Sequence, residues 1–139
     1  MTDARLPWLL DGIVPPRDEL PGAGGLGLGE AVIADAEGSA RRADLDAILS
    51  SLPEGSVECS PGERDALLRQ VESEHRVAFQ SVVNMAYTAY YTDPRVLHAL
   101  QQRTGYQAAP PQPHGYALDS FDEQLIERVR QRPAMWRRA

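Results

Sequence analysis

The sequence from Ser60 to Pro94 reads SPGERDALLRQVESEHRVAFQSVVNMAYTAYYTDP, and it indicates the fold class. Ser60, Pro61 and Glu63 form the signature of a helix start, because the serine and glutamate side chains can cap the first turn and proline fits its first position. Neither proline nor glycine occurs between Glu63 and Thr92. Apolar residues recur there at three- and four-residue steps, which predicts one amphipathic helix of about thirty residues that ends at the Asp-Pro step.

Shorter helices are predicted on both sides of this long one. Apolar clusters before it predict helices over residues 5–14, 30–36 and 43–52. After it, Asp93 can cap a helix that ends at Gly105. Ser120 and Glu123 form a second capping box, which predicts a helix that contains Phe121, Leu125, Ile126 and Val129 and ends before Pro133. No segment shows the sustained alternation of a strand.

The 139 residues are therefore predicted to form a single all-α domain. We expect a small irregular domain with one long central helix and extended loops rich in proline and glycine. Residues 1–29 would be an extended N-terminal segment that includes a short apolar cluster, residues 30–132 the helical body, and residues 133–139 a tail. Two irregular passages stand out, over residues 15–29 and 106–118, because closely spaced proline and glycine prevent helix formation.

Composition excludes several classes of function. The net charge of -6 argues against binding to a nucleic-acid backbone, which requires a basic surface. Cys59 is the only cysteine, so an internal disulfide, a cysteine-based zinc site and covalent haem attachment are excluded. We see no secretion signal at the start and no apolar stretch of about 20 residues. The chain as written is expected in the cytoplasm, and in the periplasm only if a partner carries the export signal or the sequence was trimmed.

No motif predicts a catalytic, cofactor-binding or metal-binding residue in this chain. Residues 22–27 read GAGGLG, which matches a dinucleotide-binding fingerprint in letters, but prolines occupy the place of the strand that this motif needs. Cys59 lacks the basic neighbours that activate a thiol. Glu72 and His75 have the spacing of a helical metal motif, although the second such motif is absent. A small helical metal enzyme that uses Glu72, His75 and either His98 or His114 remains an alternative.

Aromatic and proline-rich positions are the candidates for a partner surface. Tyrosine is favoured where a ring is buried while its hydroxyl reaches water or a partner, so the cluster around Tyr90 fits a core and an interface equally well. Irregular segments rich in proline and aromatic residues can lie along a partner at limited entropic cost. The predicted interface residues are Pro15, Pro16, Leu20, Pro21, Tyr90, Tyr91, Tyr106, Tyr116 and Trp136.

The pattern as a whole resembles the gluconate 2-dehydrogenase subunit 3 family, over most of the chain. The matching residues are Asp11-Gly12-Ile13-Val14-Pro15-Pro16, Leu20-Pro21-Gly22-Ala23, Ser60 to Glu63, Ala89-Tyr90-Tyr91-Thr92-Asp93-Pro94 with Val96, Gly105-Tyr106, Pro113, Gly115-Tyr116, Phe121-Asp122-Glu123 and Val129-Arg130. Many members of that family begin with a twin-arginine export signal, which this sequence lacks. This departure argues against export by this chain.

The resemblance implies a non-catalytic small subunit. Catalysis and FAD would belong to a large partner of the glucose-methanol-choline type that oxidises a sugar, a glycoside or a related alcohol. This chain would bind no cofactor and would assist the folding, stability or export of that partner. A haem electron acceptor would be a third subunit, such as a cytochrome c. A free-standing regulatory helical protein, stable alone as a monomer or homodimer, is a further alternative.

Overall fold

The computed structural model describes residues 3–107 and 122–132, which belong to two compact units that divide between residues 108 and 109. Every regular element of these described residues is helical, apart from one isolated bridge between Arg17 and Leu20. The all-α fold class is therefore confirmed. That the two units form a single domain stays a prediction, and each unit is described by itself.

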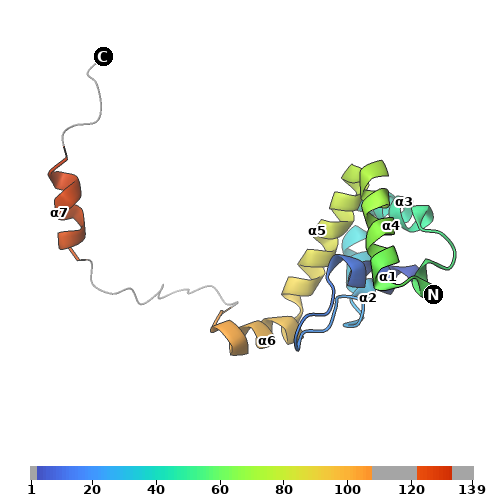
Figure 1. The fold of residues 1–139 in the computed structure, drawn as a ribbon, viewed down its shortest axis with the longest axis horizontal. Helices are drawn as coiled ribbons and strands as arrows, with labels where there is room; N and C mark the ends of the chain where they lie inside the picture. Colours follow the sequence, from blue (N-terminus) through green and yellow to red (C-terminus); the bar gives the residue numbers. More distant parts are fainter. Residues whose placement is uncertain (1–2, 108–121, 133–139) are drawn as a thin grey trace, which may run out of the picture. The chain divides into compact units, whose positions relative to one another are not determined.

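The larger unit is built around one central helix, α5 (Figure 1). Its elements are α1 (Arg5–Ile13), α2 (Gly29–Ala36), α3 (Arg41–Ser51), the 3-10 turn η1 (Ser56–Glu58), α4 (Pro61–Glu74), α5 (Arg76–Thr92) and α6 (Pro94–Thr104). Helix α5 packs mainly against α3 and also contacts α1, α2, α4 and α6. Its apolar side provides five members of the core, which are Phe79, Val82, Met85, Ala86 and Tyr90.

Local chemistry defines the helix ends that the sequence predicts. The Ser60 side chain accepts a hydrogen bond from the backbone N–H of Glu63, and the Glu63 carboxylate accepts one from the backbone N–H of Ser60 at 2.9 Å, so the capping box is confirmed. Asp93 caps α6 by accepting from the backbone N–H of Arg95 at 2.8 Å. Gly105 ends α6 with φ of 72°, a left-handed conformation that glycine adopts without strain.

The expectation of one helix from Glu63 to Thr92 is wrong, because the chain turns back at His75. His75 has φ of -127° and ψ of 44°, which is not helical. Its N–H donates to the Val71 carbonyl at 2.8 Å, and its carbonyl accepts from the Phe79 N–H at 2.8 Å. His75 therefore joins the two helices through its backbone, which bonds to the last turn of α4 and the first turn of α5, and its side chain caps neither helix. Figure 1 shows the two helices side by side, joined at this corner.

The turn at His75 follows from where the apolar residues lie. Helix α4 buries Leu68 and Val71, and the next buried residue is Phe79. The residues between Val71 and Ala78 are exposed, so the amphipathic pattern is interrupted for almost two turns. A straight helix of about thirty residues would be about 45 Å long and would carry one apolar cluster away from the core. Folding back lets both apolar faces bury.

The loop between α1 and α2 is packed in part against the body. Ala23 and Leu28 are buried, whereas Pro15, Pro16 and Pro21 are exposed. The Asp11 carboxylate accepts hydrogen bonds from the backbone N–H groups of Gly24 at 2.8 Å and Gly25 at 3.1 Å. A Cβ atom at residue 24 would collide with the Pro7 carbonyl oxygen, so this close approach requires glycine.

The smaller unit contains α7 (Gln124–Arg130). Asp122 Oδ1 accepts from the backbone N–H of Gln124 at 2.9 Å near its start. Val129 is exposed on α7, with 57% of its surface accessible. The predicted cap Ser120 and the predicted helical residue Phe121 lie outside the described residues.

Candidate partner-binding surface

Tyr90 belongs to the core of the larger unit. Only 4% of its surface is exposed, and its hydroxyl donates a hydrogen bond to the Pro21 carbonyl at 3.2 Å. Burial raises the pKa of the Tyr90 phenol above its ordinary value, and the neighbouring Tyr91 adds to this shift. The burial corrects the placement of Tyr90 among the surface residues. Its role is to join α5 to the loop that contains Pro21.

Tyr91 and Tyr87, unlike Tyr90, are exposed on α5. Their exposed fractions are 53% and 45%. The Tyr91 ring packs edge-on against Tyr90, with centroids 5.2 Å apart, and lies 6.2 Å from the Tyr87 ring. The buried Tyr90 ring therefore supports the exposed Tyr91 ring by direct contact. The two outer rings form an exposed aromatic pair that is supported by the core.

A groove between the end of α5 and α6 continues from this aromatic pair. It has a volume of about 370 Å³. Its lining residues are Tyr91, Leu97, Leu100, Thr104 and Tyr106. Tyr106 is 56% exposed, and Leu97 and Leu100 are half-buried. We call this feature the α6 groove. It brings together two of the predicted interface residues, Tyr91 and Tyr106, with two leucines that sequence reasoning had not assigned to it.

A second groove, of about 620 Å³, runs along the other side of α6. The loop residues Asp18, Glu19 and Leu20 form one wall. Arg103 of α6 pairs with Asp18, with Nη1 and Oδ2 2.9 Å apart. Asp18 has φ of 55°, which is a strained backbone conformation for a residue with a side chain. Leu20 thus lines a groove together with residues of α6, but on a different side of α6 from Tyr91 and Tyr106.

The solvent face of α5 carries almost no charge. From Val77 to Thr92 the sequence has sixteen residues and none is Asp, Glu, Lys or Arg. The exposed positions in this stretch are Val77, Gln80, Asn84, Tyr87, Thr88, Tyr91 and Thr92. Val77 is 82% exposed. In a chain with 24% charged residues, this surface resembles the centre of a protein interface, where charges are depleted and tyrosine is enriched.

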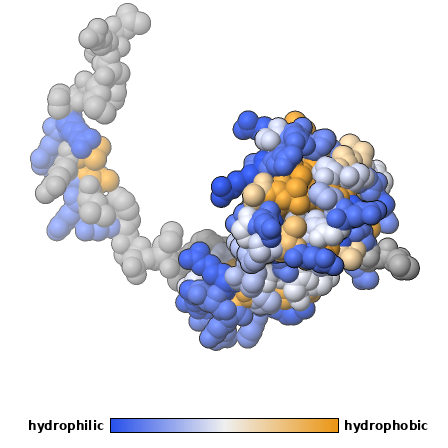
Figure 2. Space-filling model, turned by 45° about the vertical axis from the view of Figure 1, so that its right-hand side comes forward, coloured by the Kyte–Doolittle hydropathy of each residue, from blue (hydrophilic) through white to orange (hydrophobic). Residues whose placement is uncertain are grey.

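Apolar surface is also accessible where α1, α4 and α5 meet. A groove of about 310 Å³ lies there, and Leu68, Phe79 and Val83 contribute to its lining. Tyr87 lines the same groove, so it adjoins the uncharged face of α5. Figure 2 shows apolar side chains exposed among polar ones on one face of the helical body.

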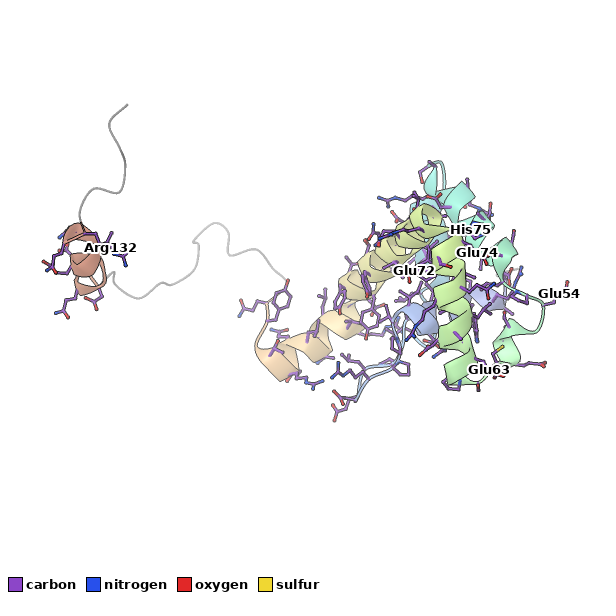
Figure 3. All side chains as sticks on the ribbon, turned by 45° about the horizontal axis from the view of Figure 1, so that its top comes forward. Glu54, Glu63, Glu72, Glu74, His75 and Arg132 are labelled. Carbon is purple, nitrogen blue, oxygen red and sulfur yellow. The ribbon has the colours of Figure 1, made fainter. Side chains whose placement is uncertain are left out.

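The residues of the alternative metal site do not form a cluster in the described part of the chain. Glu72 lies in the last turn of α4 and His75 at the corner that follows, as Figure 3 shows, and both are exposed. His98 lies on α6, and His114 lies outside the described residues. Within residues 3–107 and 122–132, no group of three or more His, Cys, Asp or Glu side chains is placed to hold a metal ion.

The glycine-rich loop has no geometry for a dinucleotide. No strand leads into it, and two of its backbone N–H groups already donate to the Asp11 carboxylate. A negative side chain thus occupies the place that a phosphate would need. Cys59 is half-buried just before α4. The predicted interface residues Tyr116 and Trp136 lie outside the described residues.

The predicted interface residues did not include four exposed side chains of α5, which are Val77, Gln80, Asn84 and Tyr87, although Tyr87 belongs to the aromatic cluster that was considered. The missing signal was the absence of charge from Val77 to Thr92, since a helix with a solvated face normally places charged side chains there.

Comparisons with models of known protein families, with curated proteins and with solved structures find no match. Across the described residues, no helix is both long and apolar enough to span a membrane.

Proposed function

We propose that this chain is a non-catalytic subunit that binds and stabilises the FAD-containing catalytic subunit of an oxidoreductase acting on a sugar, a glycoside or a related alcohol. The observation that carries the proposal is the uncharged solvent face of α5, which continues into the apolar α6 groove. Binding of a partner to such a surface lowers the free energy, because apolar area leaves water and no charge is desolvated. The identity of the partner rests on the family resemblance of the sequence.

The candidate surfaces fit a binding role better than a catalytic one. The α6 groove is lined by two tyrosines, two leucines and a threonine, and no carboxylate, imidazole or thiol stands beside the hydroxyl groups to activate them. General acid–base or nucleophilic catalysis would require such groups within hydrogen-bonding reach of a substrate. Tyrosine rings and aliphatic side chains instead provide contact area at low conformational cost. The chemistry would then be supplied by the partner and its FAD.

Affinity purification of the tagged full chain from its native host tests this function. A larger protein that carries stoichiometric flavin should be recovered with the tagged chain and be identified by mass spectrometry. Expression of that protein with and without the present chain provides the control. The flavoprotein should lose solubility or FAD when expressed alone, and equal solubility, FAD content and activity without this chain would contradict the proposal.

A further inference from the structure

Five exposed residues of α5 form a regular line, which we call the α5 stripe. Its members are Val77, Gln80, Asn84, Tyr87 and Tyr91, and their spacing is three, four, three and four residues. This spacing repeats every seven residues and keeps all five side chains on one side of the helix. It is the pattern by which one helix packs along another, with side chains of each entering the gaps of the other. A strand or an irregular loop does not match this repeat.

We infer that the α5 stripe is a helix-binding seam, and that its occupant is an α-helix of the FAD-containing subunit whose contact face carries no charged side chain. This inference rests on the proposed function for the identity of the partner. A charged side chain opposite the stripe would lose its hydration and find no counter-charge, because the stripe offers none. The stripe therefore selects its partner partly by rejecting charged helices.

Two amides in the middle of the stripe add a polar requirement. Gln80 Nε2 donates a hydrogen bond to Asn84 Oδ1 at 3.1 Å. This single bond leaves the Gln80 carbonyl oxygen and the Asn84 N–H donors for other partners. When a helix covers them, an amide or hydroxyl side chain of that helix must pair with them, since buried polar groups are costly if left unbonded. The occupant is therefore apolar opposite Val77 and Tyr91 and carries Asn, Gln, Ser or Thr between.

Charge on the neighbouring helix favours a different chain over a second copy of this one. Asp65, Arg69 and Glu72 of α4 border the groove that Tyr87 lines, so acidic groups outnumber basic ones at this edge. Residues 3–107 contain sixteen Asp and Glu and nine Arg. Two copies would bring like charges together at the edge of the seam, whereas a helix with Arg or Lys beside its uncharged face would complement it.

A charge placed in the stripe tests the seam. Asn84→Arg puts a cation at its centre, and Gln70→Arg makes the matched amide-to-arginine change on the exposed face of α4. Both variants should keep the helical circular dichroism and the melting temperature of the wild type. Asn84→Arg should weaken binding of the flavoprotein by about 100-fold or more, because it buries an unpaired charge, and Gln70→Arg should leave affinity unchanged.

The outcomes separate the seam from the proposed function. If wild-type chain recovers no flavoprotein, the proposed function is contradicted. If wild type, Asn84→Arg and Gln70→Arg all bind it equally, the function stands and the seam is wrong. If Asn84→Arg only dissociates a homodimer of the purified chain, the occupant is a second copy and the proposal is overturned.

Photo-crosslinking in the native host tests the helical nature of the occupant without depending on flavin. A photoreactive amino acid replaces Val77, Asn84 or Tyr91 in the full chain, with residue 70 as the control position. The stripe positions should crosslink to residues three or four apart on one segment of another protein, in an order that follows the stripe. Crosslinks to a second copy, crosslinks scattered over distant segments, or none above the control would overturn the seam.

Discussion

Helices α4 and α5 pack side by side and are separated by one residue, yet their solvent faces differ in charge. The face of α4 carries Glu63, Asp65, Arg69, Glu72 and Glu74. The face of α5 carries uncharged side chains from Val77 onward. Both helices bury an apolar face in the same core, so burial within the chain does not explain the contrast. The proposed function accounts for the difference, because a partner would cover the uncharged face of α5 and leave the charged face of α4 in water.

The largest expected effect compares the two adjacent tyrosines of α5. Tyr90→Ala should lower the free energy of unfolding by about 3–5 kcal/mol, because it removes a buried ring and leaves a cavity. Tyr91→Ala should change it by less than about 0.5 kcal/mol, because most of that ring faces solvent. Urea denaturation of both variants measures the difference. Equal losses would mean that the buried and exposed faces of α5 are wrongly assigned.

A smaller effect is expected at the start of α4. Ser60→Ala removes the capping side chain and should lower the free energy of unfolding by about 1 kcal/mol. Ser60→Thr is the conservative control, because its hydroxyl can accept the same backbone N–H bond and donate to the Glu63 carboxylate as serine does. The measurement is urea denaturation at neutral pH. A loss as large in Ser60→Thr as in Ser60→Ala would show that the cap is not the cause.

The free energy of unfolding should depend on acidic pH through Glu63 of α4 and on alkaline pH through Tyr90 of α5. Hydrogen bonds from the Ser60 side chain and backbone lower the pKa of Glu63, so its stabilising effect is present above the ordinary pKa and is lost as pH falls through the lowered value. Burial raises the pKa of Tyr90, so its stabilising effect is present below the ordinary value of 10.0 and is lost as pH rises through the raised value.

Unfolding titrations of two variants separate these contributions. Glu63→Gln should lose less stability on acidification than the wild type does, and Tyr90→Phe should lose less above pH 10.0. Tyrosinate absorbance provides an independent check, since Tyr90 should ionise at a higher pH than an ordinary tyrosine. An unchanged alkaline limb in Tyr90→Phe would contradict the assignment.

The smallest effect is expected at the corner between the helices. His75→Ala should change the free energy of unfolding by less than about 0.5 kcal/mol, because the side chain is exposed and provides no cap for α5. Elemental analysis of the isolated chain should find no bound metal in either form. Stoichiometric metal in the wild type that disappears in His75→Ala would instead support the alternative of a metal enzyme.

The sequence alone determined the all-α class and several helix ends. Ser60 with Glu63, Asp93 and Gly105 act on backbone groups within a few residues, so their effect can be predicted without knowing the rest of the chain. For the candidate site, Tyr91 and Tyr106 were predicted from residue type and are exposed, and the uncharged run of α5 was visible in the printed sequence. That these tyrosines contact a partner stays a prediction.

Only the tertiary structure decided where the long apolar pattern turns and which tyrosine faces the core. The break at His75 has no proline or glycine to mark it, and it arises because Leu68 and Phe79 must reach the same core from opposite directions. Tyr90 and Tyr91 differ by about 100° around one helix axis, and the position of Pro21 from a distant loop selects Tyr90 for burial. Local sequence sets helix ends by short-range hydrogen bonds, whereas the choice of which helix face is buried depends on residues far away in the same chain.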